Sequence, residues 1–191
     1  MIENFLRRPR GAAEYIADAV RVLGVVGIIV AAVGWTATDA GILAFALPAL
    51  LVPRFVGVRP WFDIFFGITV LVAAWSNVLD LYTSLAGWDL IVHFTATGVL
   101  SAMLYLLLSR WGVVPSPQES GFRRRVPWVI VPAIGLAISA LWEMVEWFGF
   151  TFISDQIFVT YTDTIGDMAV GGLGAVLAGC ALASVRLDRA A

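Results

Sequence analysis

Six long apolar runs dominate this sequence and restrict what it can fold into. They lie at about 20–37, 41–58, 62–79, 88–110, 126–149 and 164–186. Each is near the roughly 17–25 residues that an α-helix needs to cross the hydrocarbon core of a bilayer. Backbone groups in lipid must satisfy their own hydrogen bonds, and a helix does so within one segment. The sequence therefore predicts an all-α, polytopic membrane protein with six transmembrane helices.

The composition agrees with this fold class and excludes several functions. Of the 191 residues 60% are hydrophobic and 14% are charged, which is unusual for a soluble domain. A net charge of -2 leaves no broad basic surface for nucleic acid. The single cysteine, Cys180, excludes an internal disulfide and a cysteine-rich zinc site. We predict one six-helix transmembrane domain over 1–191, in which residues 1–19 form a cytoplasmic or interfacial segment.

The distribution of arginine predicts the orientation of the chain. All twelve basic residues are arginines, and with six spans all of them fall on one side of the membrane. The loops on the other side carry no basic residue. By the positive-inside rule the arginine-rich side is cytoplasmic. We therefore expect a multi-pass protein of the cell (inner or plasma) membrane with both termini in the cytoplasm. Near the inner end of the third run, Asp63 is expected to pair with Arg59 or to face water.

Three of the runs carry pairs of polar residues spaced three or four apart. The pairs are Asp89 and His93, Glu143 and Glu146, and Asp163 and Asp167. This spacing places both members of a pair on one face of a helix. His93 is the only histidine of the chain. In the predicted topology all three pairs lie near the extracytoplasmic face, so we expect them to form one site.

Such a cluster is costly to bury in a membrane unless something compensates its charge. A carboxylate held ionised at the centre of the bilayer costs about 2.5–3.5 kcal/mol. Protonation of some acids, a water-filled cleft or a bound cation would each reduce this cost. Carboxylates together with one imidazole favour a divalent ion such as Zn, Mn, Fe or Mg. The predicted metal ligands are Asp89, His93, Glu143, Glu146, Asp163 and Asp167, and the predicted catalytic residues are His93, Glu143 and Glu146.

Simpler explanations exist for some members of the cluster. Asp89 and Asp163 each stand where a helix cap is expected, and a histidine near a helix end is commonly an interfacial residue with its own hydrogen bonds. Glu143 and Glu146 are harder to explain in this way, since two glutamates one turn apart in an apolar helix have no evident structural role. A functional polar site is therefore favoured over a purely structural network.

The sixth run contains small residues at helical spacing. They are Gly171, Gly172, Gly174, Ala175, Ala178 and Gly179. Small residues allow helix backbones to approach each other closely in lipid. The pattern predicts that this helix packs at the centre of the bundle, which would place Asp163 and Asp167 against the other polar residues. A homodimer interface along the same stripe is the competing interpretation.

Three short motifs, read together, resemble a known family. They are Trp88-Asp89-x-x-x-His93-Phe94, Trp142-Glu143-x-x-Glu146-Trp147 and Asp163-x-x-x-Asp167-Met168. Over residues 75–180 the chain resembles the YjdF-like inner-membrane proteins and, more distantly, the VanZ-like family. The VanZ-like pattern has Lys, Gln and Asn where this chain has Leu90, Glu146 and Asp167, and these departures favour the YjdF-like side. The resemblance implies a small multi-helix membrane protein and supplies no reaction.

The leading functional hypothesis is a metal-dependent hydrolase in the membrane that acts on a lipid or lipid-linked substrate from the outer leaflet. The metal would activate a bound water, and a remaining carboxylate would act as general base. Two other classes stay open. One is a cation- or proton-coupled transporter, and the other is a non-catalytic accessory subunit of a membrane complex. The expected partners are the bilayer, a lipid-type substrate and a further copy of the chain, but not nucleic acid.

Overall fold

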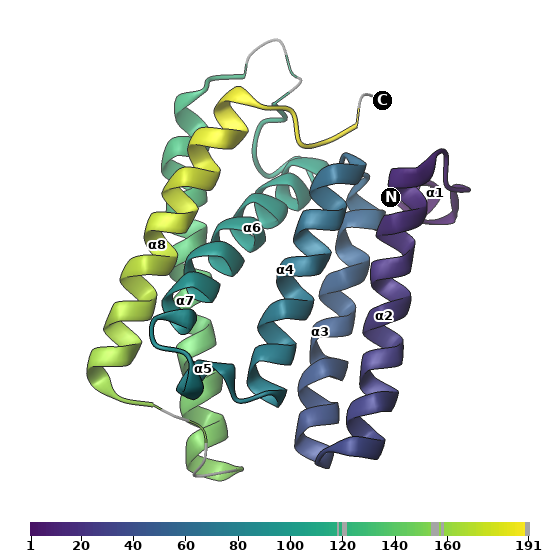
Figure 1. The fold of residues 1–191 in the computed structure, drawn as a ribbon. Helices are drawn as coiled ribbons and strands as arrows, with labels where there is room; N and C mark the ends of the chain where they lie inside the picture. Colours follow the sequence, from purple (N-terminus) through teal and green to yellow (C-terminus); the bar gives the residue numbers. More distant parts are fainter. Residues whose placement is uncertain (118, 120–121, 154–156, 158, 190–191) are drawn as a thin grey trace. The chain divides into compact units, whose positions relative to one another are not determined.

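The computed structural model of the chain describes residues 1–117, 119, 122–153, 157 and 159–189 (Figure 1). Within these residues all regular secondary structure is helical, apart from one isolated β-bridge between Val58 and Asp188. The chain forms two compact units. The first contains residues 1–88 together with the C-terminal segment from residue 186, and the second contains residues 89–185. The two units are described separately.

Six helices are long and apolar enough to cross a membrane. They are α2 (Ala12–Gly34), α3 (Ala37–Val56), α4 (Pro60–Val78), α6 (Trp88–Arg110), α7 (Arg125–Phe152) and α8 (Tyr161–Ser184). Two short helices, α1 (Ile2–Leu6) and α5 (Leu81–Ser84), complete the described elements. The prediction of an all-α protein with six transmembrane helices is confirmed.

The first long helix begins earlier than its apolar run. The run was predicted from about residue 20, whereas α2 begins at Ala12. The added turns carry Glu14 and Asp18, and these charged residues make the apolar run in the sequence shorter than the helix. Both are paired: Arg7 Nη2 lies 2.8 Å from Glu14 Oε2, and Arg21 Nη1 lies 2.9 Å from Asp18 Oδ1. Because these charges are compensated, the helix continues through them.

The first unit is a bundle of α2, α3 and α4 with a charged end. Arg21 of α2 is buried and donates to Leu50 O, to Asp18 and to Asp63 of α4. The expected pairing of Asp63 with Arg59 was therefore wrong. A neighbouring helix supplies the partner of Asp63, and the sequence spacing gave no sign of it.

The C-terminal segment returns to this end of the first unit. The backbone amide of Arg59 donates to Leu187 O at 2.7 Å, and the amide of Arg189 donates to Gly57 O at 3.1 Å. The guanidinium of Arg189 lies 2.9 Å from Glu14 Oε1. These contacts join residues near the end of the chain to α2 and to the α3–α4 turn.

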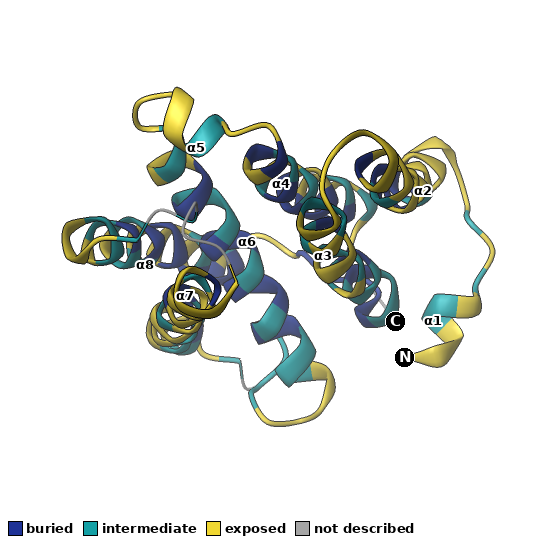
Figure 2. Ribbon diagram, turned by 90° about the horizontal axis from the view of Figure 1, so that it is seen from below, coloured by how far each residue is buried: buried dark blue, intermediate teal, exposed yellow. Residues whose placement is uncertain are grey.

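The second unit consists of α6, α7 and α8, which approach each other at small residues. A Cβ atom at Gly98 of α6 would lie 2.9 Å from Gly174 O of α8, and one at Gly174 would collide with Phe94 O. A Cβ at Gly179 would lie 2.7 Å from Pro127 O of α7. The glycines of α8 thus pack against both other helices of this unit. Figure 2, which looks along the axis of α7, shows that much of this helix is exposed or intermediate in burial.

Candidate metal centre

All six predicted ligands belong to the second unit and lie at the same end of its helices. Asp89 and His93 are in the first two turns of α6, and Asp163 and Asp167 are in the first two turns of α8. Glu143 and Glu146 are in the last turns of α7. The arginines of this unit, Arg110 and 123–125, lie at the opposite helix ends. His93 is therefore the only basic side chain that the sequence provides at this end of the unit.

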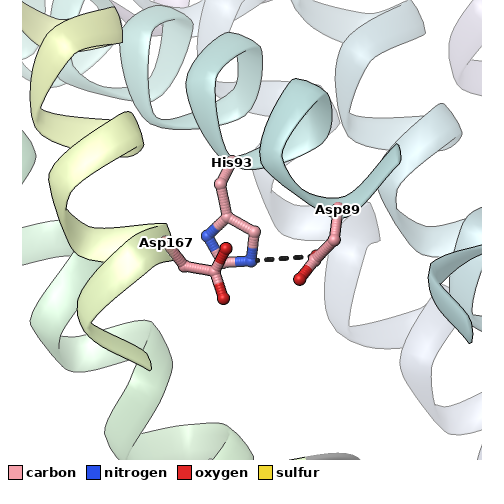
Figure 3. A group of neighbouring side chains, drawn as sticks. All are labelled: Asp89, His93 and Asp167. Carbon is pink, nitrogen blue, oxygen red and sulfur yellow. Dashed lines mark ion pairs between the residues drawn. The ribbon is translucent and has the colours of Figure 1, made fainter. Parts of the chain in front are cut away.

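A first group of possible ligands joins α6 to α8. Asp89, His93 and Asp167 each offer a ligand atom, and these atoms all lie within 4.8 Å of one another. His93 Nε2 is 3.3 Å from Asp89 Oδ1. Figure 3 shows the imidazole with Asp89 on its own helix at one side and Asp167 reaching it from α8. The exposed fractions of His93 and Asp167 are only 8% and 2%.

A second group joins α6 to α7 and also includes the imidazole. The group consists of His93, Glu143 and Glu146, each of which offers one ligand atom, and these three atoms lie within 4.8 Å of one another. Glu143 is buried, and Glu146 is partly exposed. The indole Nε1 of Trp142 donates to Glu146 Oε1 at 2.8 Å. The side chain of Trp142 is 40% exposed, so this hydrogen bond connects the group to the surface of α7.

Asp163 belongs to neither of these groups among the described residues. It lies in the first turn of α8, one turn before Asp167. The explanation of Asp163 as a helix cap is not supported, because Thr160 is the N-cap and its hydroxyl oxygen accepts from the Asp163 amide at 3.3 Å. The structure thus places Asp163 at the edge of the cluster.

Three buried oxygens at this site have no hydrogen-bond partner within the described part of the chain. They are Ser139 Oγ, Glu143 Oε1 and Asp167 Oδ1. Buried polar groups are nearly always paired, and an unpaired one costs about 1–3 kcal/mol, or more if it is charged. Two of the three are carboxylate oxygens, which accept but do not donate when ionised. A cation, a proton or a water molecule would each satisfy such oxygens.

Hydroxyl groups from two helices converge one turn deeper than the carboxylates. A Cβ atom at Gly171 of α8 would lie 2.8 Å from Thr97 Oγ1 of α6 and 3.1 Å from Ser139 Oγ of α7. Gly171 therefore leaves room for both side chains. Their steps of four from His93, Glu143 and Asp167 place them on the same helix faces as these ligands.

Trp142 is a further residue that the sequence analysis did not assign a role at the site. Its spacing of four residues from Glu146 places both side chains on one face of α7, and this spacing could have predicted the hydrogen bond.

Comparison with protein families decides the class of the chain. Residues 15–189 match the family described as "Predicted membrane protein (DUF2238)". The chain belongs to this family. The match includes all six predicted ligands and all six long helices except the first residues of α2. This DUF2238 protein is an integral membrane protein, which is consistent with the YjdF-like resemblance. No curated protein and no solved structure matches its sequence.

Proposed function

We propose that this DUF2238 protein binds divalent metal at the cluster of α6, α7 and α8 and uses it to hydrolyse a lipid or lipid-linked substrate. One observation carries the proposal: Glu143 and Asp167 each bury a carboxylate oxygen without a partner in the described chain, beside the imidazole of His93. The YjdF-like and VanZ-like resemblances supply no reaction, so the chemistry is inferred from these residues.

The charge of the cluster supports a cation. Among the six predicted ligands, five carboxylates accompany a single imidazole. Even a protonated imidazole would compensate only one of them. Each carboxylate left ionised in the bilayer costs up to about 2.5–3.5 kcal/mol. Carboxylate oxygens with one imidazole nitrogen suit Zn, Mn or Fe, and an all-oxygen set would suit Mg.

Hydrolysis is the reaction class that such a metal supports through a water molecule bound to it. A bound divalent ion would lower the pKa of a water molecule toward neutral pH. The oxygen of that water would form a bond to a carbonyl carbon or a phosphorus atom of the substrate, and the bond to the alcohol or amine leaving group would break. A carboxylate of the cluster would take the proton from the water and pass it to the leaving group. Glu146 is our candidate for this base because it is the partly exposed member of its group, while His93 and Glu143 hold the metal.

The surroundings of the cluster support a substrate that comes from the membrane. The helix α7 has 28 residues, about 42 Å at 1.5 Å per residue, and the hydrocarbon core is about 30 Å thick. Its last turns carry the exposed aromatic residues Trp147 and Phe148, which suit the interface between lipid and water. The hydrogen bond from Trp142 connects this exposed face to Glu146. The positive-inside rule assigns this end of the unit to the outer leaflet.

A transporter is less well supported than a hydrolase. The polar stripe on α6 continues from His93 to Thr97 and Ser101, as a cation or proton path would require. However, Ser101 donates its hydroxyl to Thr97 O, and a Cβ at Gly135 of α7 would lie 2.9 Å from Ser101 Oγ. Ser101 is thus satisfied by its own helix and closely packed.

The experiment is a lipid hydrolysis assay with the purified full chain. The protein is reconstituted into vesicles made from radiolabelled total lipid of the expression host, with added Zn²⁺ or Mn²⁺. We expect release of a labelled headgroup or fatty acid, which a chelator stops. Glu146→Gln should lower the rate about 10²-fold or more, since it removes the proposed base. Glu119→Gln, which changes an exposed carboxylate between α6 and α7, is the matched control. No release from metal-loaded wild-type protein would overturn the proposed reaction.

A further inference from the structure

We infer that the cluster holds two divalent ions rather than one. This inference rests on the proposed metal site and specifies its composition. The possible ligands form two groups, Asp89–His93–Asp167 and His93–Glu143–Glu146, which share only His93. Ligand atoms bound to one ion at about 2.0–2.3 Å must lie within about 4.6 Å of each other. Each group meets a limit of 4.8 Å, but the five residues do not meet it as a single group.

The shared imidazole cannot serve both groups as an ordinary ligand. A neutral imidazole has one nitrogen with a free lone pair and one that carries a proton. His93 therefore binds one ion, and carboxylate oxygens and water must hold the other. A site with two ions and one imidazole needs more carboxylate ligands than imidazole ligands. The cluster has five carboxylates and one imidazole.

Each group contains its own buried oxygen without a partner. Asp167, whose Oδ1 has no partner within the described residues, is a member of the first group, and Glu143, whose Oε1 has none, is a member of the second. Asp167 is on α8 and Glu143 is on α7, so the two oxygens come from different helices. A single ion placed in one group would leave the buried oxygen of the other group without compensation within the described residues.

The charge of the cluster also favours two ions. With one divalent ion and a neutral imidazole, the five carboxylates keep three negative charges. With two ions they keep one. Two ions separated by about 3.5–4 Å are common in hydrolytic sites, where they stabilise both the attacking and the leaving oxygen. The two groups share His93, so the two ions would lie on either side of one residue.

The experiment measures how many ions one chain binds. The full chain, purified in detergent and stripped with a chelator, is loaded with Mn²⁺ or with Zn²⁺, desalted and analysed for bound metal. We expect two ions per chain, with an exchange-coupled electron paramagnetic resonance spectrum for Mn²⁺. Asp89→Asn and Glu143→Gln should each reduce the number from two to one and remove the coupling. Glu119→Gln should keep both ions. Size-exclusion profiles and circular dichroism confirm that each variant is folded.

The possible outcomes separate this inference from the proposed function. One ion per chain, lost in both Asp89→Asn and Glu143→Gln, would overturn the two-ion inference and leave the metal-dependent function standing. Two ions that are uncoupled and unaffected by both variants would also overturn it, since they would lie elsewhere. No bound metal in the wild-type protein would overturn both proposals.

Discussion

His93 Nε2 lies 3.3 Å from Asp89 Oδ1, one helical turn earlier on α6. A histidine that binds a metal usually has its other ring nitrogen held by a carboxylate, which fixes the orientation of the ring. Asp89 supplies such a contact from the same helix, so one of its oxygens can restrain the imidazole while the carboxylate remains available as a ligand. The contact thus restrains the imidazole of His93, and α7 and α8 supply further carboxylates near it.

Metal should stabilise the folded protein, and this effect should depend on Asp167. A ligand that binds only the native state at 100 times its Kd stabilises it by about 2.7 kcal/mol. We expect Zn²⁺ or Mn²⁺ to raise the Tm of the wild-type protein in detergent, and Asp167→Asn to remove most of this rise. Without metal, Asp167→Asn should be at least as stable as the wild type, because it replaces a buried carboxylate oxygen that lacks a partner in the described chain. A Tm rise of equal size in both proteins would contradict the prediction.

The close contact between α6 and α8 should not tolerate a larger side chain. A Cβ at Gly174 would collide with Phe94 O, which is backbone and cannot rotate away. We expect Gly174→Ala to destabilise the protein by about 1–3 kcal/mol, as overpacking commonly does. Gly166→Ala on the same helix is the control, because no other side chain lies within 4 Å of its Cβ position. Chemical denaturation in detergent measures both, and equal stability of the two variants would count against the described packing of α8.

In the first unit, the effects of substituting Arg21 and Asp63 on the free energy of unfolding should be coupled, because the two side chains form a buried ion pair. Arg21→Met leaves the buried carboxylate of Asp63 without its main partner, which we expect to cost about 3–5 kcal/mol. The double variant Arg21→Met, Asp63→Leu should cost less than the single Arg21 change, because no uncompensated charge remains. A double-mutant cycle of unfolding free energies tests this. Additive effects would show that the two side chains do not interact.

The orientation of the chain can be tested by cysteine labelling of intact cells. In a Cys180→Ala background, Ser84→Cys on α5 and Glu119→Cys in the loop between α6 and α7 introduce exposed thiols. The positive-inside rule predicts that a membrane-impermeant maleimide labels the first thiol and not the second. The reverse pattern would place both the termini and the metal cluster on the opposite sides from those predicted.

The long helices could be predicted from the sequence because the bilayer imposes a minimum apolar length on each of them. The start of α2 could not, since Glu14 and Asp18 shorten the apolar run over its first turns. The partner of Asp63 was missed for a different reason: Arg21 is 42 residues away in the sequence and lies on another helix. Such pairings depend on how helices rotate and pack, which the spacing within one helix does not determine.

The residues of the candidate site could be proposed from the sequence, but the way in which they group around His93 could not. Spacing placed each pair on one face of a helix, and topology placed the three pairs at one end. The division into two groups around His93 depends on the rotation of α7 and α8 about their axes. The same rotation buries Asp167 and leaves Asp163, one turn away, at the edge of the cluster.

Anomalous X-ray scattering from crystals of the Mn²⁺- or Zn²⁺-loaded protein tests the central claim most directly. The account predicts anomalous density between the first turns of α6 and α8 and the last turns of α7, about 2.0–2.3 Å from a nitrogen of His93 and from carboxylate oxygens. The account would be contradicted if no anomalous density appeared there and if Glu143 and Asp167 were hydrogen-bonded to water or to other side chains instead.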